Sequence, residues 1–370
     1  MKTRRSISLQ KVEKGLKSKY AYFNLKGPVW HFDSGRYTYL LIKSFHLAGF
    51  PVLIRKNYGL LSRLVKYKSL LLKLSFKIVS EGLDTKKQER ANVIHIQNGS
   101  FEKRVHLCFK DEIPAESSTT FLMPYLMHPM MYAENYLDSI YKLREKDTSF
   151  KIIFAGNTDE KEYSRSILKD KFAKTNRFLA ISYLIENLLE SQVISVKNDK
   201  TLACSGAYLN KLLLVQSSHL KVPFKNWLPT LAKADFFLAC SGSRMPMCHN
   251  VIEAMAVGAI PILEYPEYFH PPLKHGYNCI VYKGVEDLKN KIDEVLIIDE
   301  EKIKLLKQNV VNYYDTYLDA SAWINDLLEM PYKEVELVVN AHLVPSNKEI
   351  PTDVYTSEDS IPNLTNQKLL

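Results

Sequence analysis

The sequence predicts an α/β protein built from two Rossmann-like domains that face each other across a cleft. In the N-terminal half, a short apolar strand at residues 29–32, a turn at Asp33, a helix over 36–48 and a strand over 51–54 follow one another. The same order of elements recurs in the C-terminal half, within residues 234–264. Strands that alternate with helices form parallel sheets, because each helix returns the chain to the start of the next strand.

Apolar segments elsewhere in the chain supply the other elements of the two domains. Short runs rich in Val, Ile and Phe predict strands, whereas longer stretches with apolar residues three or four apart predict helices. The expected strands span residues 93–96, 105–109, 120–122, 151–155 and 193–196, and the expected helices span residues 177–189, 227–234 and 302–328.

The domain boundaries follow changes in composition. A charged stretch over 138–149 predicts a linker helix, so we expect one Rossmann-like domain over 1–145 and a second over 146–330. The remainder, 331–370, is expected to be a C-terminal extension that is partly disordered, because its end is polar. Within it, residues 334–339 have the composition of a strand.

The overall composition limits the class of protein. The chain has 370 residues, of which 46% are hydrophobic, enough for two domains with their own cores. Lys and Arg number 50 against 41 Asp and Glu, a net charge of +9, which suits an anionic ligand or an anionic membrane surface. The basic residues do not interleave with aromatic ones as in a recognisable nucleic-acid module, so we expect no nucleic-acid partner.

Several features point to a cytoplasmic location. The five cysteines are odd in number and scattered, without a Cys-x-x-Cys pair, so neither a zinc site nor a disulfide framework is expected. The N-terminus is basic but has no apolar core, unlike a signal peptide. Residues 55–77 mix leucines with seven Lys and Arg residues. This stretch is either an ordinary amphipathic helix or a peripheral contact with the inner face of a membrane.

The segment 234–264 is the most informative about function. It predicts a buried strand, a polar loop, a helix over 250–256 that ends before Gly258, and a second buried strand. The loop therefore lies at the carboxyl end of a strand, where α/β sheets bind ligands. The N-terminus of the helix presents free N–H groups to an anion such as a diphosphate. Glu253, inside the helix, is either a ligand contact or a surface glutamate.

Polar residues beside this unit are the donor-side candidates. Ser241, Ser243 and Arg244 lie in the loop, where they either contact a phosphate or sugar or simply form a turn. Gly156 and Asn157 follow the first strand of the second domain, and a glycine there lets the backbone approach a ligand closely.

The motif EAMAVGAIPI at residues 253–262 resembles the nucleotide-sugar-binding core of GT-B glycosyltransferases. Residues 275–281 and the helix over 285–296 are similar to the next strand and helix of that family. Residues 154–156, followed by Arg165, are similar to the first strand and loop of the donor domain in exostosin-like members. The resemblance covers roughly residues 150–300 and depends on the order of these motifs, since none of them is highly specific alone.

The resemblance implies a transferase that moves a sugar from a nucleotide-activated donor to an acceptor hydroxyl. The donor would bind the C-terminal domain, with Arg165 holding a phosphate. A glycan, a lipid-linked molecule or a protein would be the acceptor at the N-terminal domain, in polysaccharide, lipopolysaccharide or glycoconjugate synthesis. A terminal helix would cross back to the first domain. No Asp-x-Asp occurs, so basic side chains and helix dipoles would replace a metal, and no cofactor is expected.

Two departures from the family's patterns leave the stereochemical outcome open. Retaining families often carry a second glutamate where this chain has Met245, and exostosin-like members tend to have Arg at the position of Asn250. Two rival functions also stay open: a nucleotide-sugar epimerase on the same fold, and a degenerate, non-catalytic binding module. Donor turnover without acceptor would indicate the first, and binding without turnover the second.

The catalytic candidates lie at the first turn of the N-terminal domain, facing the cleft. Asp33 is the preferred base for the acceptor hydroxyl and His31 the second candidate. Their alternative roles are a helix N-cap for Asp33 and a structural histidine for His31, and Arg36 would shape the acceptor side. His249 and Asn250 adjoin the core helix and are expected to reach the donor.

Overall fold

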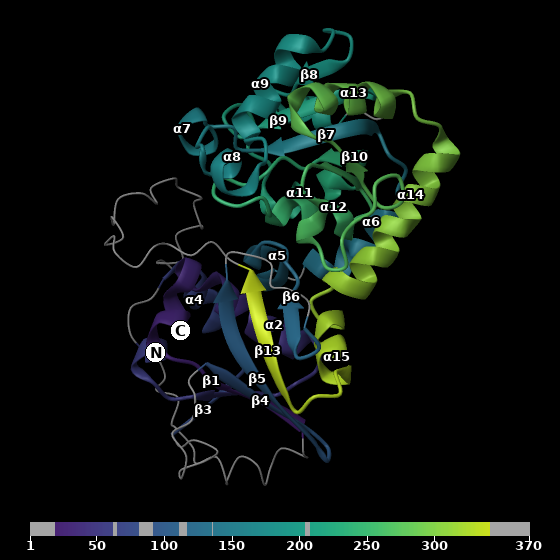
Figure 1. The fold of residues 1–370 in the computed structure, drawn as a ribbon. Coiled ribbons are helices and arrows are strands. Elements are labelled where there is room, and N and C mark those ends of the chain that lie inside the picture. Colours follow the sequence, from purple (N-terminus) through teal and green to yellow (C-terminus); the bar gives the residue numbers. More distant parts are fainter. Residues whose placement is uncertain are drawn as a thin grey trace, which may run out of the picture.

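The computed structural model describes residues 19–61, 65–80, 92–110, 117–134, 136–203 and 208–340. They form two lobes, each built on its own sheet, which meet along one face (Figure 1). This arrangement confirms the predicted α/β fold of two Rossmann-like domains.

The first sheet belongs to the N-terminal lobe and has the order β3-β2-β1-β4-β5-β13-β6. Strands β1, β2 and β3 are parallel, β4 runs antiparallel to both β1 and β5, and β13 runs parallel to β5 and β6. The strands are β1 Lys19–Asn24, β2 Val52–Arg55, β3 Lys77–Val79, β4 Val93–Asn98, β5 Phe101–Lys110, β6 Thr120–Met123 and β13 Glu334–Asn340.

The first strand of the chain is β1, and the prediction of a strand at 29–32 is wrong. These residues lie in the 3-10 helix η1 (Gly27–Gly35), which has Pro28 as its second residue and buries Trp30. A four-residue apolar run cannot distinguish a strand from a short helical turn, and Pro near a helix start favours the helix. The predicted helix over 36–48 is confirmed as α2 (Arg36–Leu47), and Gly49 follows it with φ of +76°.

The second sheet, in the C-terminal lobe, is entirely parallel, with the order β12-β11-β10-β7-β9-β8. From β7 the chain first builds one side of the sheet and then returns to build the other side from β10. The boundary between β7 and β10 is therefore the topological switch point, outside which such sheets bind ligands. The strands are β7 Phe150–Gly156, β8 Val193–Ser195, β9 Tyr208–Gln216, β10 Ala234–Leu238, β11 Ile260–Leu263 and β12 Ile280–Val281.

Helices surround this sheet and confirm the predicted strand–loop–helix–strand unit. The helix of this unit is α12. Gly258 lies in the turn after α12, where it has a left-handed backbone with φ of +86°. The helices of the lobe are α7 Glu160–Tyr163, α8 Ile167–Phe172, α9 Arg177–Asn187, α10 Asp199–Ala203, α11 Phe224–Leu231, α12 His249–Ala256 and α13 Gly284–Leu296.

The C-terminal helices cross back to the first lobe. Helix α14 (Glu300–Tyr313) continues into a π-helical turn, and α15 (Ala322–Glu329) then packs on the N-terminal lobe (Figure 1). Trp323 is buried there, 6.4 Å from the ring of Phe45 and 6.1 Å from that of Phe121. The single helix expected over 302–328 is thus interrupted before Ala322.

The last residues that the structure describes form a strand of the first sheet. The predicted strand at 334–339 is confirmed as β13, and it lies between β5 and β6 rather than in an extension. The buried Lys103 side chain fixes the approach to this strand, because its Nζ donates to the carbonyls of Leu327, Leu328 and Met330 at 2.6, 3.2 and 2.7 Å. Residues 341–370 lie outside the described residues.

Between the lobes, three short helices replace the expected linker helix over 138–149: α5 (Pro129–Ala133), η2 (Tyr136–Ser139) and α6 (Ile140–Arg144). Arg144 fastens α6 to the C-terminal lobe. Its Nε donates to the carbonyl of Ala256 at 2.7 Å, and its other nitrogens form two bonds of 2.9 and 2.8 Å with Asp315.

The basic stretch 55–77 is not one continuous amphipathic helix. It contains α3 (Tyr58–Leu61) and α4 (Lys66–Leu71), and residues 62–64 lie outside the described part. Lys68 points inward, where its Nζ donates to the carbonyl of Gly59 at 2.8 Å. Of the described helices, none has the length and apolar character to cross a membrane. Cys108, Cys240, Cys248 and Cys279 are free thiols, and Cys204 is outside the described residues.

Candidate functional site

Four predicted residues meet at the switch point of the C-terminal sheet. Gly156 is the last residue of β7, and Ser241 lies in the loop between β10 and α12. A Cβ atom on Gly156 would lie 3.3 Å from Nη1 of Arg177 and 3.9 Å from Nδ2 of Asn250. Glycine therefore lets α9 and α12 approach the end of β7. Asn157 follows directly, and its carbonyl also faces Arg177.

Arg177, which sequence reasoning did not select, lies at the centre of this crevice and is 2% exposed. Its Nε, Nη1 and Nη2 donate to the carbonyls of Ser241, Asn157 and Cys240 at 3.2, 3.1 and 3.4 Å. The guanidinium also lies 4.3 Å from the ring centroid of Tyr163. Carbonyls and an aromatic face orient this cation, and no carboxylate from the described part of the chain pairs with it.

A signal for Arg177 was present in the sequence. Asn176 is an N-cap, since its Oδ1 accepts from the backbone N–H of Leu179 at 2.8 Å, and Arg177 is therefore the first helical residue. A cation at a helix N-terminus is unfavourable because the helix dipole is positive there. An arginine directly after an N-cap asparagine thus indicates a placement that local helix stability does not explain.

The N-terminus of α12 opens at the same crevice. Its N-cap is Cys248, whose side chain makes no capping hydrogen bond. Beside it, Oγ of Ser241 and Oδ1 of Asn250 are buried without a hydrogen-bond partner among the described residues. Buried polar atoms are generally paired in folded proteins. These unpaired atoms, next to free helix N–H groups, mark a position for a polar ligand.

The facing domain contributes Arg36, the first residue of α2. Its side chain is 12% exposed, and its Nε and Nη2 are buried without a hydrogen-bond partner among the described residues. The guanidinium lies 3.7 Å from Oδ2 of Asp33 and 5.2 Å from the ring centroid of Tyr125. Its positive charge acts on both His249 and Glu253 of α12, so a cation from each domain, Arg36 and Arg177, influences this helix.

His249 begins α12 and is half-buried. Burial lowers its pKa well below the usual value, and the nearby His128, Arg36 and Arg177 lower that pKa further. The imidazole is therefore neutral near pH 7, with one donor and one acceptor nitrogen. Its ring centroid lies 5.0 Å from that of His128, which comes from the interdomain segment.

Glu253 lies one turn further along α12 and is 1% exposed. Oε1 accepts from the backbone N–H of His128 at 2.8 Å, and Oε2 accepts from Nε1 of Trp227 at 2.5 Å. Burial raises the pKa of this carboxyl to about 7, although both hydrogen bonds and Arg36 oppose that rise. Both oxygens are engaged by protein groups, so the carboxyl anchors α12 to the interdomain segment.

His128 is itself fixed in one orientation. Its Nδ1 accepts from the backbone N–H of Met130 at 3.2 Å, so the neutral ring carries its proton on Nε2, 3.0 Å from the hydroxyl of Tyr67. Its ring also stacks on Phe224 with centroids 5.0 Å apart. The two hydrogen bonds that join Tyr67 to His128 and His128 to Glu253 therefore connect the N-terminal lobe to the C-terminal lobe.

The other predicted residues take varied positions. Asp33 has a left-handed backbone (φ of 43°) and does not cap α2, whose N-cap is Gly35; its carboxylate instead pairs with Arg36. His31 lies two residues earlier in η1. Arg165 is exposed between α7 and α8. Ser243 and Arg244 are half-buried in the loop before α12.

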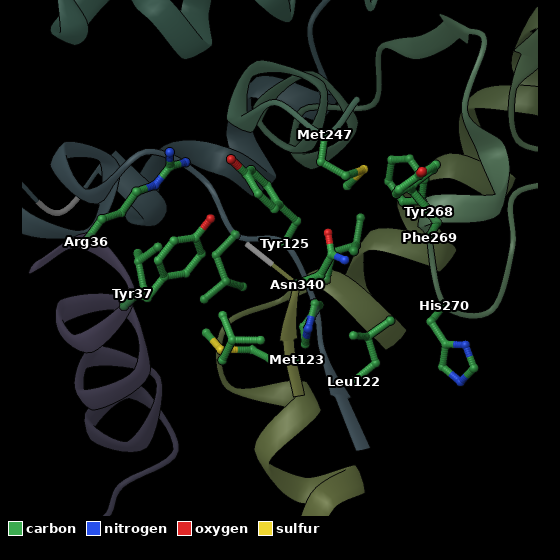
Figure 2. Close-up of a pocket in the computed structure, with 15 residues that line it drawn as sticks. Arg36, Tyr37, Leu122, Met123, Tyr125, Met247, Tyr268, Phe269, His270 and Asn340 are labelled. Carbon is green, nitrogen blue, oxygen red and sulfur yellow. The ribbon is translucent and has the colours of Figure 1, made fainter. Parts of the chain in front are cut away.

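Next to Arg36, a pocket opens between the two domains (Figure 2). Arg36 lies at one side and His270 at the opposite side, with the aromatic rings of Tyr37 and Tyr125 near Arg36. Residues of α2, of the ends of β6 and β13, and of the loop before α12 line it. Among the described residues, no three His, Cys, Asp or Glu side chains form a group that could hold a metal ion.

No protein-family model and no curated protein matches this sequence. Among solved structures, the chain is similar to the N-terminal domain of a trehalose-6-phosphate phosphatase from Candida albicans. The identity is 14% over 54% of this chain and 45% of that chain, with a TM-score of 0.31. It is also similar to a variant of the wall teichoic acid polymerase TagF, with 14% identity over 53% and 47% and a TM-score of 0.26. The chain spans about half the length of these structures, and similarity at this level concerns the fold alone.

Proposed function

We propose that this protein is a GT-B glycosyltransferase. It binds a nucleotide-sugar donor at the switch point of its C-terminal domain and transfers the sugar to an acceptor hydroxyl at its N-terminal domain. One observation carries the proposal: the uncapped N-terminus of α12 lies beside the buried cation Arg177, which donates to the N-cap residue Cys248, and beside the unpaired polar atoms of Ser241 and Asn250, while Arg36 of the facing domain lines a pocket with Met247 of the loop before α12.

The donor diphosphate matches each of these groups. The N–H groups of α12 and the positive end of its dipole bind phosphate oxygens. The unpaired nitrogens of Arg36 hydrogen-bond the same anion, while Arg177 adds positive potential from the other side. The hydroxyls of the donor ribose or sugar can donate to Oδ1 of Asn250 and Oγ of Ser241. Glu253 does not contact the donor in this proposal; its hydrogen bonds to His128 and Trp227 hold α12 in place.

The chemistry follows from the same arrangement. Asp33 takes the proton of the acceptor hydroxyl, that oxygen bonds to the anomeric carbon, and the bond from this carbon to the diphosphate breaks. Negative charge then grows on the leaving diphosphate, where Arg36, Arg177 and the α12 dipole are already oriented to stabilise it. The 3.7 Å pair between Asp33 and Arg36 keeps the base close to the group that holds the leaving phosphate.

The remaining parts of the proposal concern the surroundings of the reaction. No metal ion is needed to neutralise the leaving diphosphate, because Arg36, Arg177 and the dipole of α12 supply the positive charge that a metal ion would otherwise provide. The acceptor is a glycan, a lipid-linked molecule or a protein, and the enzyme acts in the cytoplasm or at the inner face of a membrane.

Calorimetry with a panel of nucleoside diphosphates (UDP, GDP, ADP and dTDP) and the matching nucleosides tests the proposal. We expect at least one diphosphate to bind. In Arg36→Ala its affinity should fall about 10-fold to 150-fold, the equivalent of about 1.5–3 kcal/mol for a charge-assisted hydrogen bond. Nucleoside binding should be unchanged. Arg104→Ala is the matched control, because Arg104 is 55% exposed on β5 and pairs with Glu334.

Three outcomes would overturn parts of the proposal. Failure of every diphosphate to bind would refute the donor site. Conversion of a nucleotide sugar in the absence of any acceptor would indicate an epimerase instead. Binding of a nucleotide sugar without turnover, across a broad acceptor panel, would indicate a binding module.

A further inference from the structure

The lining of the interdomain pocket is mostly apolar, although the cation Arg36 lies at one side of it. Its polar groups are the side chains of Arg36, His270 and Asn340 and the hydroxyls of Tyr37, Tyr125 and Tyr268. The rest of the wall is aliphatic or aromatic, and includes Leu122, Met123, Tyr125, Met247, Phe269 and Leu318. The polar groups therefore cover only part of the wall, and the larger part suits an apolar portion of a ligand.

Asn340 gives this pocket one specific polar contact. It is the last residue of β13, and both Oδ1 and Nδ2 of its amide are buried without a hydrogen-bond partner among the described residues. Such an amide offers one acceptor and a donor side by side. A hydroxyl group needs both, since it donates one hydrogen bond and accepts others.

We propose that the pocket binds the acceptor, and that the acceptor is an amphiphile: a sugar joined to an apolar aglycone, as in a lipid-linked glycan. The sugar lies between Arg36 and Asn340, and the aglycone lies along the apolar wall. This inference rests on the proposed function for the role of the sugar hydroxyl. It selects the lipid-linked class from the three kinds of acceptor.

The balance of polar and apolar surface supports this choice. A sugar that extended along the apolar wall would leave its hydroxyls there without partners, and an unpaired buried polar group is costly. An aliphatic aglycone gains affinity instead, by about fourfold for each methylene that is fully buried. Two buried methylenes would therefore raise affinity by more than tenfold.

Matched n-hexyl and methyl glycosides of glucose, galactose, mannose and N-acetylglucosamine provide the test. Binding of each pair is measured by calorimetry on the full chain, with and without a saturating nucleoside diphosphate. We expect at least one n-hexyl glycoside to bind at least tenfold more tightly than its methyl counterpart. Leu122→Ala should reduce this preference at least threefold, whereas Leu305→Ala, at an exposed position on α14, should leave it unchanged.

The outcomes separate the inference from the proposed function. Equal affinities within every pair, or no binding by any glycoside, would overturn the inference, even if a nucleoside diphosphate binds. A hexyl preference unaffected by Leu122→Ala would also overturn it, because the apolar contact would then lie elsewhere. Loss of diphosphate binding alone would count against the donor site and not against the pocket.

Discussion

The stability of the protein should depend on the protonation of Glu253, and the structure predicts the sign. Burial raises the pKa of this carboxyl from 4.5 to about 7. Between these values the native carboxyl keeps its proton while the unfolded one has lost it, so folding takes up a proton. The free energy of unfolding therefore falls as the pH rises through this window, and it levels off above about pH 7. At about 1.4 kcal/mol for each pKa unit, the total change is about 3 kcal/mol.

The variant Glu253→Gln isolates this contribution, because the amide does not titrate. Its nitrogen cannot accept from either His128 or Trp227, so the variant should lose a hydrogen-bond contribution of about 1–3 kcal/mol that does not itself depend on pH. We expect the wild type to be the more stable protein at pH 5. Its advantage over the variant should shrink by about 3 kcal/mol on going to pH 8.

Urea unfolding of both proteins at pH intervals between 4.5 and 8.5 measures this difference, and comparing the two cancels the titration of other groups. Glu301→Gln, at an exposed position in the first turn of α14, controls for the loss of one carboxylate. An advantage that does not vary with pH would refute the raised pKa. An advantage that grows with pH would show that the ionised carboxylate is favoured, and Glu253 would then be a charged member of the site.

Three other changes test separate parts of the structure. Gly242→Ala should destabilise the loop before α12 by about 1–3 kcal/mol in urea unfolding, since its Cβ would lie 2.7 Å from the carbonyl oxygen of Met245; Gly27→Ala, with no atom within 4 Å, should cost much less. Lys103→Met should cost about 1–3 kcal/mol by leaving buried carbonyls at the end of α15 unpaired, and an unchanged unfolding midpoint would contradict this role. Glycosyl transfer, once an acceptor is found, should continue in excess EDTA; complete loss that manganese or magnesium restores would show metal-dependent chemistry.

Most strands of the C-terminal lobe could be predicted because they are buried on both faces, although β9 and helices α7, α8 and α10 were not predicted. Such strands consist of continuous apolar runs, as in Phe236–Phe237–Leu238 and Ile260–Pro261–Ile262. The N-terminal lobe was harder. Strand β1 begins at Lys19 and is formed by tyrosines, alanine and phenylalanine rather than by Val or Ile. The apolar run after Pro28, which looked more like a strand, folds as a 3-10 helix.

The site was predicted only where it is local in sequence. Gly156, Ser241 and Asn250 could be selected because each follows a strand or begins a helix of the same parallel sheet. Arg177 was not selected: its position directly after the N-cap Asn176 signals an unusual placement, but its contacts are with carbonyls more than sixty residues away. The engagement of Glu253 by Trp227 and His128 likewise depends on how α11 and the interdomain segment pack, which no short motif encodes.

Helix α12 connects the proposed anion site with the arrangement of the domains. Its N-terminus lies beside Arg177, while Glu253, one turn later, is bound to the interdomain segment through His128. The cation on the N-terminal lobe can act at the crevice only while the two lobes stay close, and Glu253 is one of the contacts that keep them close. An anion at the N-terminus of α12 would bind both lobes at once. Donor binding should therefore stabilise the closed arrangement, because it adds a second connection between the same two bodies through the same helix.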